Sequence, residues 1–322
     1  MMKPDPPSTT SRASSPPRDR HPSLDSHWFG AVLCAISAAG FASLTILSKS
    51  AMAMGLSLVK ILIIRFALAA ILLWIYIAAR RGRAVFPGWK ITLTLLALGT
   101  FGYALQSSLF FTGLQRISAS LTSLILYAYP VFVALLDWIF NRKVPTWRSW
   151  IAMVVAFAGV LLTVGPEELF SGEIGNDIVG AGAVLLGSAF YAAYLVAVAR
   201  VSPRAGTLVS TAWVCAGACI GFMLVGDFLP ALQGSFNMQS VGFATAMAVI
   251  GTIIPLGAII AGMERVGPLV GSLIATLEPV FTVLLAMLLL GERLNLLQAA
   301  GGGLVLLAVI LLNLPMRKSY SN

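Results

Sequence analysis

Charged residues are scarce in this 322-residue chain: only 10% of its residues are Lys, Arg, Asp or Glu, while 58% are hydrophobic. Soluble globular domains are about 25% charged. So little charge does not provide the water-exposed surface that a soluble protein of this length needs. The composition therefore excludes the soluble classes and indicates a polytopic membrane protein.

Cysteine and histidine are almost as rare, with three and two copies. The cysteines all fall in apolar runs and their number is odd, so they indicate neither a disulfide framework nor a metal motif. The sequence also lacks a Walker loop and the HExxH, GxSxG and paired-Asp motifs. We therefore predict no enzyme activity, no metal, no cofactor and no ATP-driven pumping.

The formal net charge of +9 raises the question of a nucleic-acid partner. The basic residues are scattered through short segments and form no stripe with interleaved aromatic residues. Membrane topology explains them better, and we predict no nucleic-acid partner.

Apolar segments of about 20 residues, the length that crosses a bilayer core, follow one another along most of the chain. We expect an all-α membrane protein with ten transmembrane helices. The predicted spans are 28–48, 57–79, 90–112, 118–140, 147–165, 177–199, 207–226, 240–263, 267–290 and 295–314. Residues 1–27, rich in Pro, Ser and Arg, are predicted to form a disordered cytoplasmic tail, and residues 315–322 a C-terminal cytoplasmic tail.

The connecting segments determine the predicted orientation, because Lys and Arg collect on the cytoplasmic side of a membrane. With a cytoplasmic N-terminus, sixteen basic residues lie inside and four outside. The acidic segment 166–177 then lies outside. Both termini are therefore predicted to be cytoplasmic.

The chain also repeats itself at an offset of 149 residues: RISASLTSLILYAYPVFVALL (116–136) aligns without a gap with RVGPLVGSLIATLEPVFTVLL (265–285). Five predicted spans separate the copies, and an odd number reverses the direction of the second copy through the membrane. We predict two inverted five-helix repeats, 28–165 and 177–314, an architecture of many secondary transporters.

Pro130 and Pro279 occupy matching positions of the two copies. Each removes a backbone hydrogen bond and frees the carbonyl four residues earlier, at Leu126 and Ala275. Such carbonyls need protein or water partners at membrane depth, so we expect both helices to face the bundle interior there. The prolines are candidate hinges, with a kink needed only for packing as the alternative.

Glu278 is an acid within an otherwise apolar run, where a charge costs roughly 2.5–3.5 kcal/mol. Three roles remain open: a protonatable coupling residue, a ligand for a substrate ammonium group, or a structural carboxylate bonded to a neighbouring helix. Arg65, within the second span, is a candidate partner for a buried acid or for an anionic substrate group. Tyr129 matches Glu278 in the first copy, so the predicted site is asymmetric.

Polar and aromatic residues recur at helical spacing and mark a candidate cavity. An uncharged lining rich in hydroxyls and aromatic rings suits an amphipathic solute with an apolar or aromatic body. Tyrosine is also enriched at membrane interfaces, so part of this set has an interfacial alternative. The candidate substrate-binding residues are Tyr103, Gln106, Ser123, Tyr127, Tyr191, Tyr194 and Thr276.

The end of the second copy resembles the end of an EamA domain of the drug/metabolite transporter superfamily, over LEPVFTVLLAMLLLGERLNLLQAAGGGLVLLAVILL (277–312). The Glu-Pro pair, Gly291-Glu292 and the Gly-rich last helix form the pattern. The resemblance implies a ten-helix, basket-like transporter with a central cavity lined chiefly by spans 1, 3, 4, 6, 8 and 9. The uncharged, Tyr-rich lining resembles that of the YddG-type aromatic amino-acid exporters. The first copy departs from the pattern, with Asn141-Arg142-Lys143 where the second has Leu290-Gly291-Glu292.

Together these features predict a multi-pass secondary transporter of the bacterial inner membrane. It would export small neutral or zwitterionic metabolites, amino acids first, by alternating access. Two alternatives remain open: an uncoupled facilitator of the same solutes, and a membrane assembly or lipid-handling protein without a soluble substrate. The expected partners are a small solute and the lipid bilayer, and a monomer is expected because the helices must pack within one chain.

Overall fold

The computed structural model describes residues 24–53, 58–81, 86–117, 119–142, 144–164, 178–225, 238–290 and 296–313. All regular elements within these ranges are helical, as expected where backbone groups must be satisfied without water. The prediction of an all-α membrane protein is confirmed at this level. Residues 1–23, 166–177 and 315–322, on which the tail and acidic-segment predictions fall, lie outside the described ranges.

The first half contains two long helices followed by interrupted ones. Its elements are α1 (Leu24–Ala53), α2 (Leu58–Arg81), α3 (Trp89–Ala97), η1 (Leu98–Ala104), α4 (Leu105–Leu114), α5 (Ala119–Leu126), α6 (Tyr129–Asn141) and α7 (Trp147–Val164). The second half contains α10 (Ile178–Ala205), α11 (Thr207–Val225), α13 (Met238–Ala248), η2 (Val249–Ile253), α14 (Ile254–Val266), α15 (Pro268–Ala275), α16 (Glu278–Leu290) and α17 (Leu296–Asn313).

Eight helical segments of the described chain are long and apolar enough to cross a membrane by length and composition. Two further apolar helices are shorter, over Trp147–Thr163 in α7 and Leu296–Leu312 in α17. The helix α1 begins at Leu24, so residues 24–27, which we expected in the disordered tail, are helical.

Both halves interrupt their helices at matching positions. Shifted back by the 149-residue offset, the π-helical turn η2 falls on residues 100–104. This range lies inside the π-helical turn η1. The break between α15 and α16 at Thr276 and Leu277 falls in the same way on the break between α5 and α6. π-helical turns are rare and are frequent at functional sites. The internal repeat of the sequence is therefore also a repeat of backbone irregularities.

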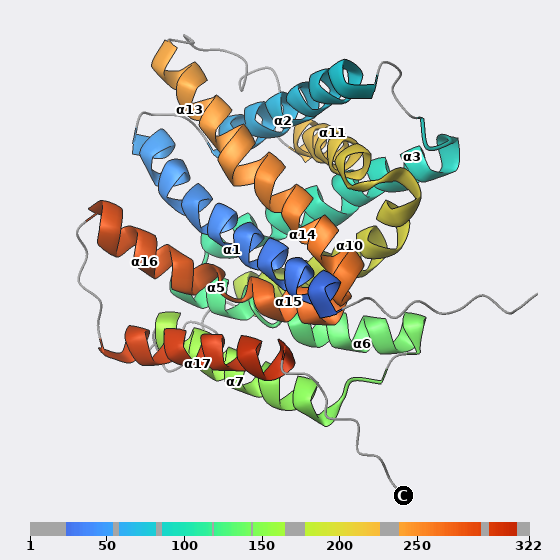
Figure 1. Cartoon of the computed structure of the whole chain (residues 1–322). Coiled ribbons are helices and arrows are strands. Elements are labelled where there is room, and N and C mark those ends of the chain that lie inside the picture. Colours follow the sequence, from blue (N-terminus) through green and yellow to red (C-terminus); the bar gives the residue numbers. More distant parts are fainter. Residues whose placement is uncertain are drawn as a thin grey trace, which may run out of the picture.

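Equivalent helices of the two halves run antiparallel against each other. Trp74 of α2 contacts Trp213 of α11 at 4.9 Å between ring centroids, whereas Phe66, earlier in α2, contacts Phe222, later in α11, at 5.6 Å. The pair α7 and α17 is also antiparallel and lies along one side of the bundle (Figure 1, lower part). Antiparallel pairing of equivalent helices relates two halves by a two-fold axis across the helices.

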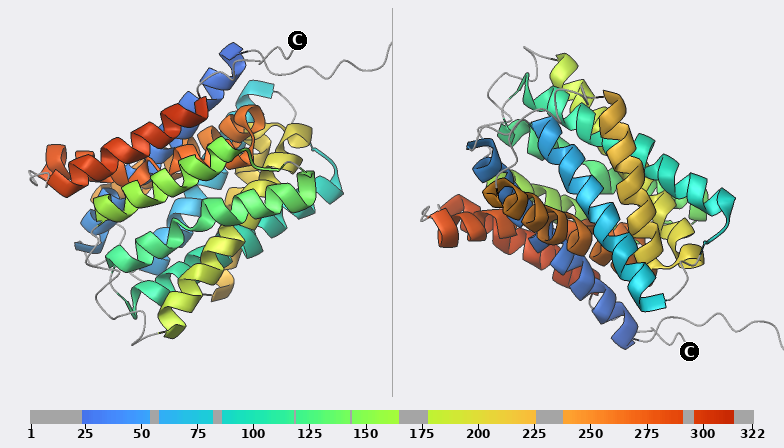
Figure 2. Two further views of the ribbon diagram at one scale, coloured as in Figure 1. Left: turned by 90° about the horizontal axis from the view of Figure 1, so that it is seen from below. Right: turned by 90° about the horizontal axis from the view of Figure 1, so that it is seen from above.

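The remaining long helices exchange partners between the halves. The first helix of one half, α1, packs along α14 of the other, and the first helix of the second half, α10, packs along α4. Figure 1 shows α1 beside α14. Figure 2 shows the same bundle from below and from above. The buried core therefore runs between the halves, at the place where both interrupted helices lie.

Small residues permit a close helix contact between α7 and α17. A Cβ atom added to Gly301 would lie 2.6 Å from the carbonyl oxygen of Gly159 and 2.6 Å from the hydroxyl oxygen of Thr163. Small residues at such positions let helix backbones approach in membranes.

We expect Gly301→Leu to destabilise the protein, because the added side chain must separate α17 from α7. Overpacking of this kind costs about 1–3 kcal/mol. Gly303→Leu is the matched control, since a Cβ there meets nothing within 4 Å. Thermal unfolding of the two variants in detergent measures the difference, and equal midpoints would contradict this account of the contact.

Candidate functional site

The candidate site lies where the two broken helices meet. Pro130 and Pro279 are the second residues of α6 and α16, and the breaks lie two to three residues upstream. We expected a kink in a continuous helix; the structure shows two separate helices at each position. Proline is favourable in the first turn of a helix because that turn needs no backbone donor, so each proline starts a new helix.

The second break exposes a carbonyl that sequence reasoning missed. The N–H of Thr276 bonds to the carbonyl of Leu273 at 3.3 Å instead of that of Ser272, which a continuous α-helix would use. The hydroxyl of Tyr129 donates a hydrogen bond to this Ser272 carbonyl at 2.9 Å. The first broken helix is thereby tied to the second at its break. The alignment of Tyr129 with Glu278 was the one sequence signal that pointed to this residue.

We expect Tyr129→Phe to destabilise the protein, because it leaves the buried Ser272 carbonyl without its hydroxyl partner. Loss of a partner for a buried polar group costs about 1–3 kcal/mol. Tyr194→Phe is the control, since the buried Tyr194 hydroxyl has no hydrogen-bond partner. Unfolding midpoints measured in one detergent compare the two, and an equal or larger loss in Tyr194→Phe would contradict this role of Tyr129.

Four of the candidate residues belong to one continuous series of rings. Tyr127, at the first break, neighbours Tyr129, which contacts Tyr191 of α10 with ring centroids 5.0 Å apart. Tyr191 stacks on Tyr194 at 6.1 Å, and Tyr194 meets Tyr103 of η1 edge to face at 5.7 Å. Edge-to-face and offset contacts of this kind are the favourable ones for aromatic rings. The series joins helices of both halves through phenol rings.

Glu278 is the first residue of α16 and lies beside this tyrosine series. Its carboxylate is close enough to interact electrostatically with Tyr103, Tyr127, Tyr129 and Tyr191. Its side chain, like those of Tyr127 and Tyr191, is half-buried and retains accessible surface. A solute that enters between these rings would meet a carboxylate and several hydroxyl groups.

Arg65 lies at the other end of the tyrosine series. Only 4% of its surface is exposed, its guanidinium is 4.5 Å from the ring centroid of Phe66, and Tyr103 lies close enough to interact with it electrostatically. Within the described part of the chain no ion pair joins it to Glu278. Arg65 was a candidate partner for a buried acid or for an anionic substrate group. The described contacts do not support the first role, since Arg65 does not pair with Glu278.

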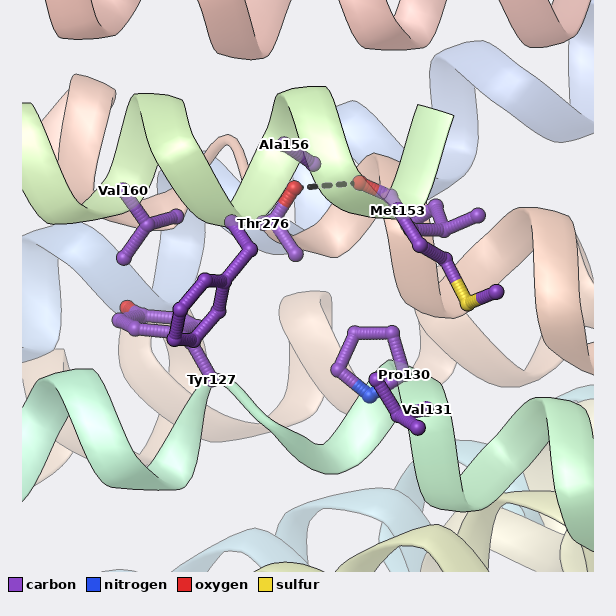
Figure 3. Close-up of a pocket in the computed structure, with 9 residues that line it drawn as sticks. Tyr127, Pro130, Val131, Met153, Ala156, Val160 and Thr276 are labelled. Carbon is purple, nitrogen blue, oxygen red and sulfur yellow. Dashed lines mark hydrogen bonds between the residues drawn. The ribbon is translucent and has the colours of Figure 1, made fainter. Parts of the chain in front are cut away.

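The three other candidate residues are not members of the ring series. The Thr276 hydroxyl donates to the Leu273 carbonyl at 2.6 Å, a bond drawn in Figure 3. Gln106 is buried in α4 and accepts a hydrogen bond from the Ser107 hydroxyl at 3.4 Å. Ser123 is half-buried in α5, and no described side-chain contact joins it to the tyrosines.

A small pocket opens between the two breaks and α7 (Figure 3). It has about 250 Å³ of empty space, including the part open to its surroundings. Tyr127, Pro130 and Thr276 of the predicted site line it, as Figure 3 shows, and the rest of its lining is apolar.

Metal chemistry finds no support in the residues that the structure describes. They contain no group of three or more His, Cys, Asp or Glu side chains that converges as a metal site requires. Cys34, Cys215 and Cys219 are unpaired and buried.

These features define a polytopic helical membrane protein built from two similar halves, with broken helices at its centre. The model of the EamA-like transporter family matches residues 28–165 and again residues 178–314. The chain belongs to this family.

Relatives agree with this assignment. The chain is 29% identical over 286 residues to an uncharacterized transporter, YcbK, of Bacillus subtilis (strain 168), which covers 85% of this chain and 89% of that protein. It is 24% identical over 259 residues to an uncharacterized inner membrane transporter, YedA, of Escherichia coli (strain K12), covering 78% and 80% of the two chains. A crystal structure that is 15% identical matches 88% of this chain and 95% of its own with a TM-score of 0.71, which shows a shared fold.

Proposed function

We propose that this transporter exports small neutral or zwitterionic metabolites, amino acids first, by alternating access. The observation that supports this most directly is the tyrosine series beside Glu278 at the breaks of two helices. Interrupted helices of inverted repeats form the substrate sites of many secondary transporters. Hydroxyl-bearing aromatic rings offer both an apolar face and hydrogen bonds to such a solute.

The proposed topology has ten spans, with α7 and α17 crossing the membrane beside each other. The antiparallel pairing of α2 with α11 and of α7 with α17 supports an inverted relation of the two repeats, 28–165 and 177–314. The distribution of basic residues supports cytoplasmic termini. The name of the Escherichia coli relative supports a bacterial inner membrane as the location.

Alternating access would use the two breaks as hinges. Pro130 and Pro279 prevent α5 from continuing into α6, and α15 into α16, so each pair of half-helices has a flexible joint. Opening would separate the tyrosine rings and enlarge the small pocket beside Tyr127 and Thr276. Glu278, at the second joint, would change its surroundings with each opening, which suits a residue that takes up and releases a proton.

Aromatic and other apolar amino acids are the first solutes to test, since the residues between Arg65 and Glu278 are uncharged and rich in tyrosine. The YddG-type aromatic amino-acid exporters, whose lining this site resembles, are the model for this choice of solutes. The proposed substrate-binding residues are Tyr103, Gln106, Ser123, Tyr127, Tyr191, Tyr194 and Thr276.

Uptake of radiolabelled amino acids into proteoliposomes tests the proposal. We expect phenylalanine or another apolar amino acid to enter at least about fivefold faster than into protein-free liposomes, with saturation at high concentration. A response to a pH gradient distinguishes coupled transport from an uncoupled facilitator. Absence of uptake for every amino acid would overturn the proposed substrate class.

A further inference from the structure

Arg65 is a buried cation that lacks an acidic partner among the described residues. Its Nε atom has no hydrogen-bond partner, and its described neighbours are Tyr103, the face of Phe66 and Cys215. The transfer of a cation from water into such a site costs several kcal/mol unless an opposite charge compensates it. A cation–π contact offsets only about 2 kcal/mol of this cost. The Arg65 guanidinium therefore lacks the opposite charge that an anionic ligand would supply.

A second buried donor without a partner belongs to Tyr194, whose ring contacts Tyr103. Tyr194 is only 1% exposed, and its hydroxyl group has no hydrogen-bond partner. Its ring contacts Tyr103, which also neighbours Arg65, and both Tyr194 and Arg65 interact electrostatically with Cys215. Buried hydroxyl groups are normally bonded, so two unpaired donors around one tyrosine indicate a site for an acceptor ligand.

The chemistry of the two donors specifies the ligand. A guanidinium presents a planar set of N–H groups that matches the two oxygens of a carboxylate. A phenol hydroxyl adds one further donor to the same acceptor. The neighbouring rings of Phe66 and Tyr103 leave an apolar wall beside the donors, and Phe66 also stacks on Phe222 at 5.6 Å.

We infer that Arg65 and Tyr194 bind the carboxylate group of the transported solute, next to Tyr103. This assignment rests on the proposed transport function and requires a carboxylate on the solute. It excludes neutral solutes without a carboxylate, retains the zwitterionic amino acids and adds simple carboxylate anions. Phenylalanine and 3-phenylpropanoate then bind, whereas phenylalaninamide and phenethylamine, which lack the carboxylate, do not. The site lies beyond the tyrosine series from the small pocket at Tyr127, so a solute reaches it when the rings separate.

Thermal unfolding of the purified full-length protein in detergent, with each of these four compounds at equal concentration, tests the assignment. We expect only the two carboxylates to raise the unfolding midpoint of the wild-type protein. Tyr194→Phe removes only an unpaired hydroxyl and is expected to weaken carboxylate binding about tenfold while the unliganded midpoint stays unchanged. Arg65→Lys retains the charge but loses the planar donor set, and a similar loss is expected.

Substitutions at two exposed residues of α2 provide matched controls. Tyr76 is 46% exposed on α2 and Arg80 lies over its ring at 5.6 Å, so Tyr76→Phe and Arg80→Lys should leave carboxylate binding unchanged.

The outcomes separate this assignment from the transport proposal. Equal midpoint shifts with phenylalanine and phenylalaninamide, or an unchanged affinity in Tyr194→Phe, would overturn the carboxylate site. Uptake of phenylalanine and phenylalaninamide into proteoliposomes at equal rates would also overturn it while transport itself stands. No shift and no uptake with any of the four compounds would overturn both.

Discussion

Replacement of Glu278 by glutamine is expected to abolish the response of amino-acid uptake to a pH gradient and to lower gradient-driven uptake at least about tenfold. Carboxylates within membrane spans commonly serve as proton relays. Glutamine retains the shape of the side chain and its capacity for hydrogen bonds, but it does not take up or release a proton. Since Glu278 forms no ion pair with any residue that the structure describes, the substitution leaves no described cation without its partner, and we expect a normally folded protein.

The measurement compares initial uptake rates in proteoliposomes with and without an imposed gradient. Exchange of solute against protons predicts faster uptake by wild-type protein when the vesicle interior is acidic, because protons leave as the solute enters. Glu264→Gln is the matched control: Glu264 accepts hydrogen bonds from Ser202 and Thr207 at one end of α14, away from the tyrosine series. Equal gradient responses in wild type and Glu278→Gln would show that Glu278 has a structural role and does not couple transport to protons.

The sequence predicted the helical class and the places where the helices break. Hydrophobic runs of membrane length restrict the backbone to helices, and the aligned prolines marked the irregular positions. The matching π-helical turns η1 and η2 had no such marker, since neither contains a proline. Helix boundaries also shifted, as at Leu24, because propensity alone does not determine where the last turns end.

The site was only partly predictable for a geometric reason. Spacing along a helix places Tyr191 and Tyr194 within one turn of each other, but it does not determine how that helix is rotated against η1. The contact of Tyr194 with Tyr103, and the position of Arg65 beside Tyr103 instead of Glu278, depend on this rotation. The bond from Tyr129 to Ser272 depends on a local backbone detail, the shift of the Thr276 N–H to Leu273, which has no sequence signature.

Replacement of Pro279 by alanine is expected to slow transport about tenfold while the binding of phenylalanine stays unchanged. Alanine restores a backbone N–H that can bond to the carbonyl of Ala275, and it favours a helix interior over proline by about 3 kcal/mol. The helix α15 would then continue into α16 as one rod. The N–H of Thr276 would return to the Ser272 carbonyl and displace the hydroxyl of Tyr129.

Pro268→Ala is the matched control for this substitution. Pro268 is the first residue of α15, where the N–H of any residue is left unpaired by the helix, so its replacement removes no joint. Saturating uptake rates in proteoliposomes measure turnover, and the midpoint shift with phenylalanine in detergent measures binding. A Pro279→Ala variant that turns over as fast as Pro268→Ala would show that the joint is a packing feature. A slow variant with intact binding requires instead that the two half-helices move separately in each transport cycle, with Glu278 at the joint between them.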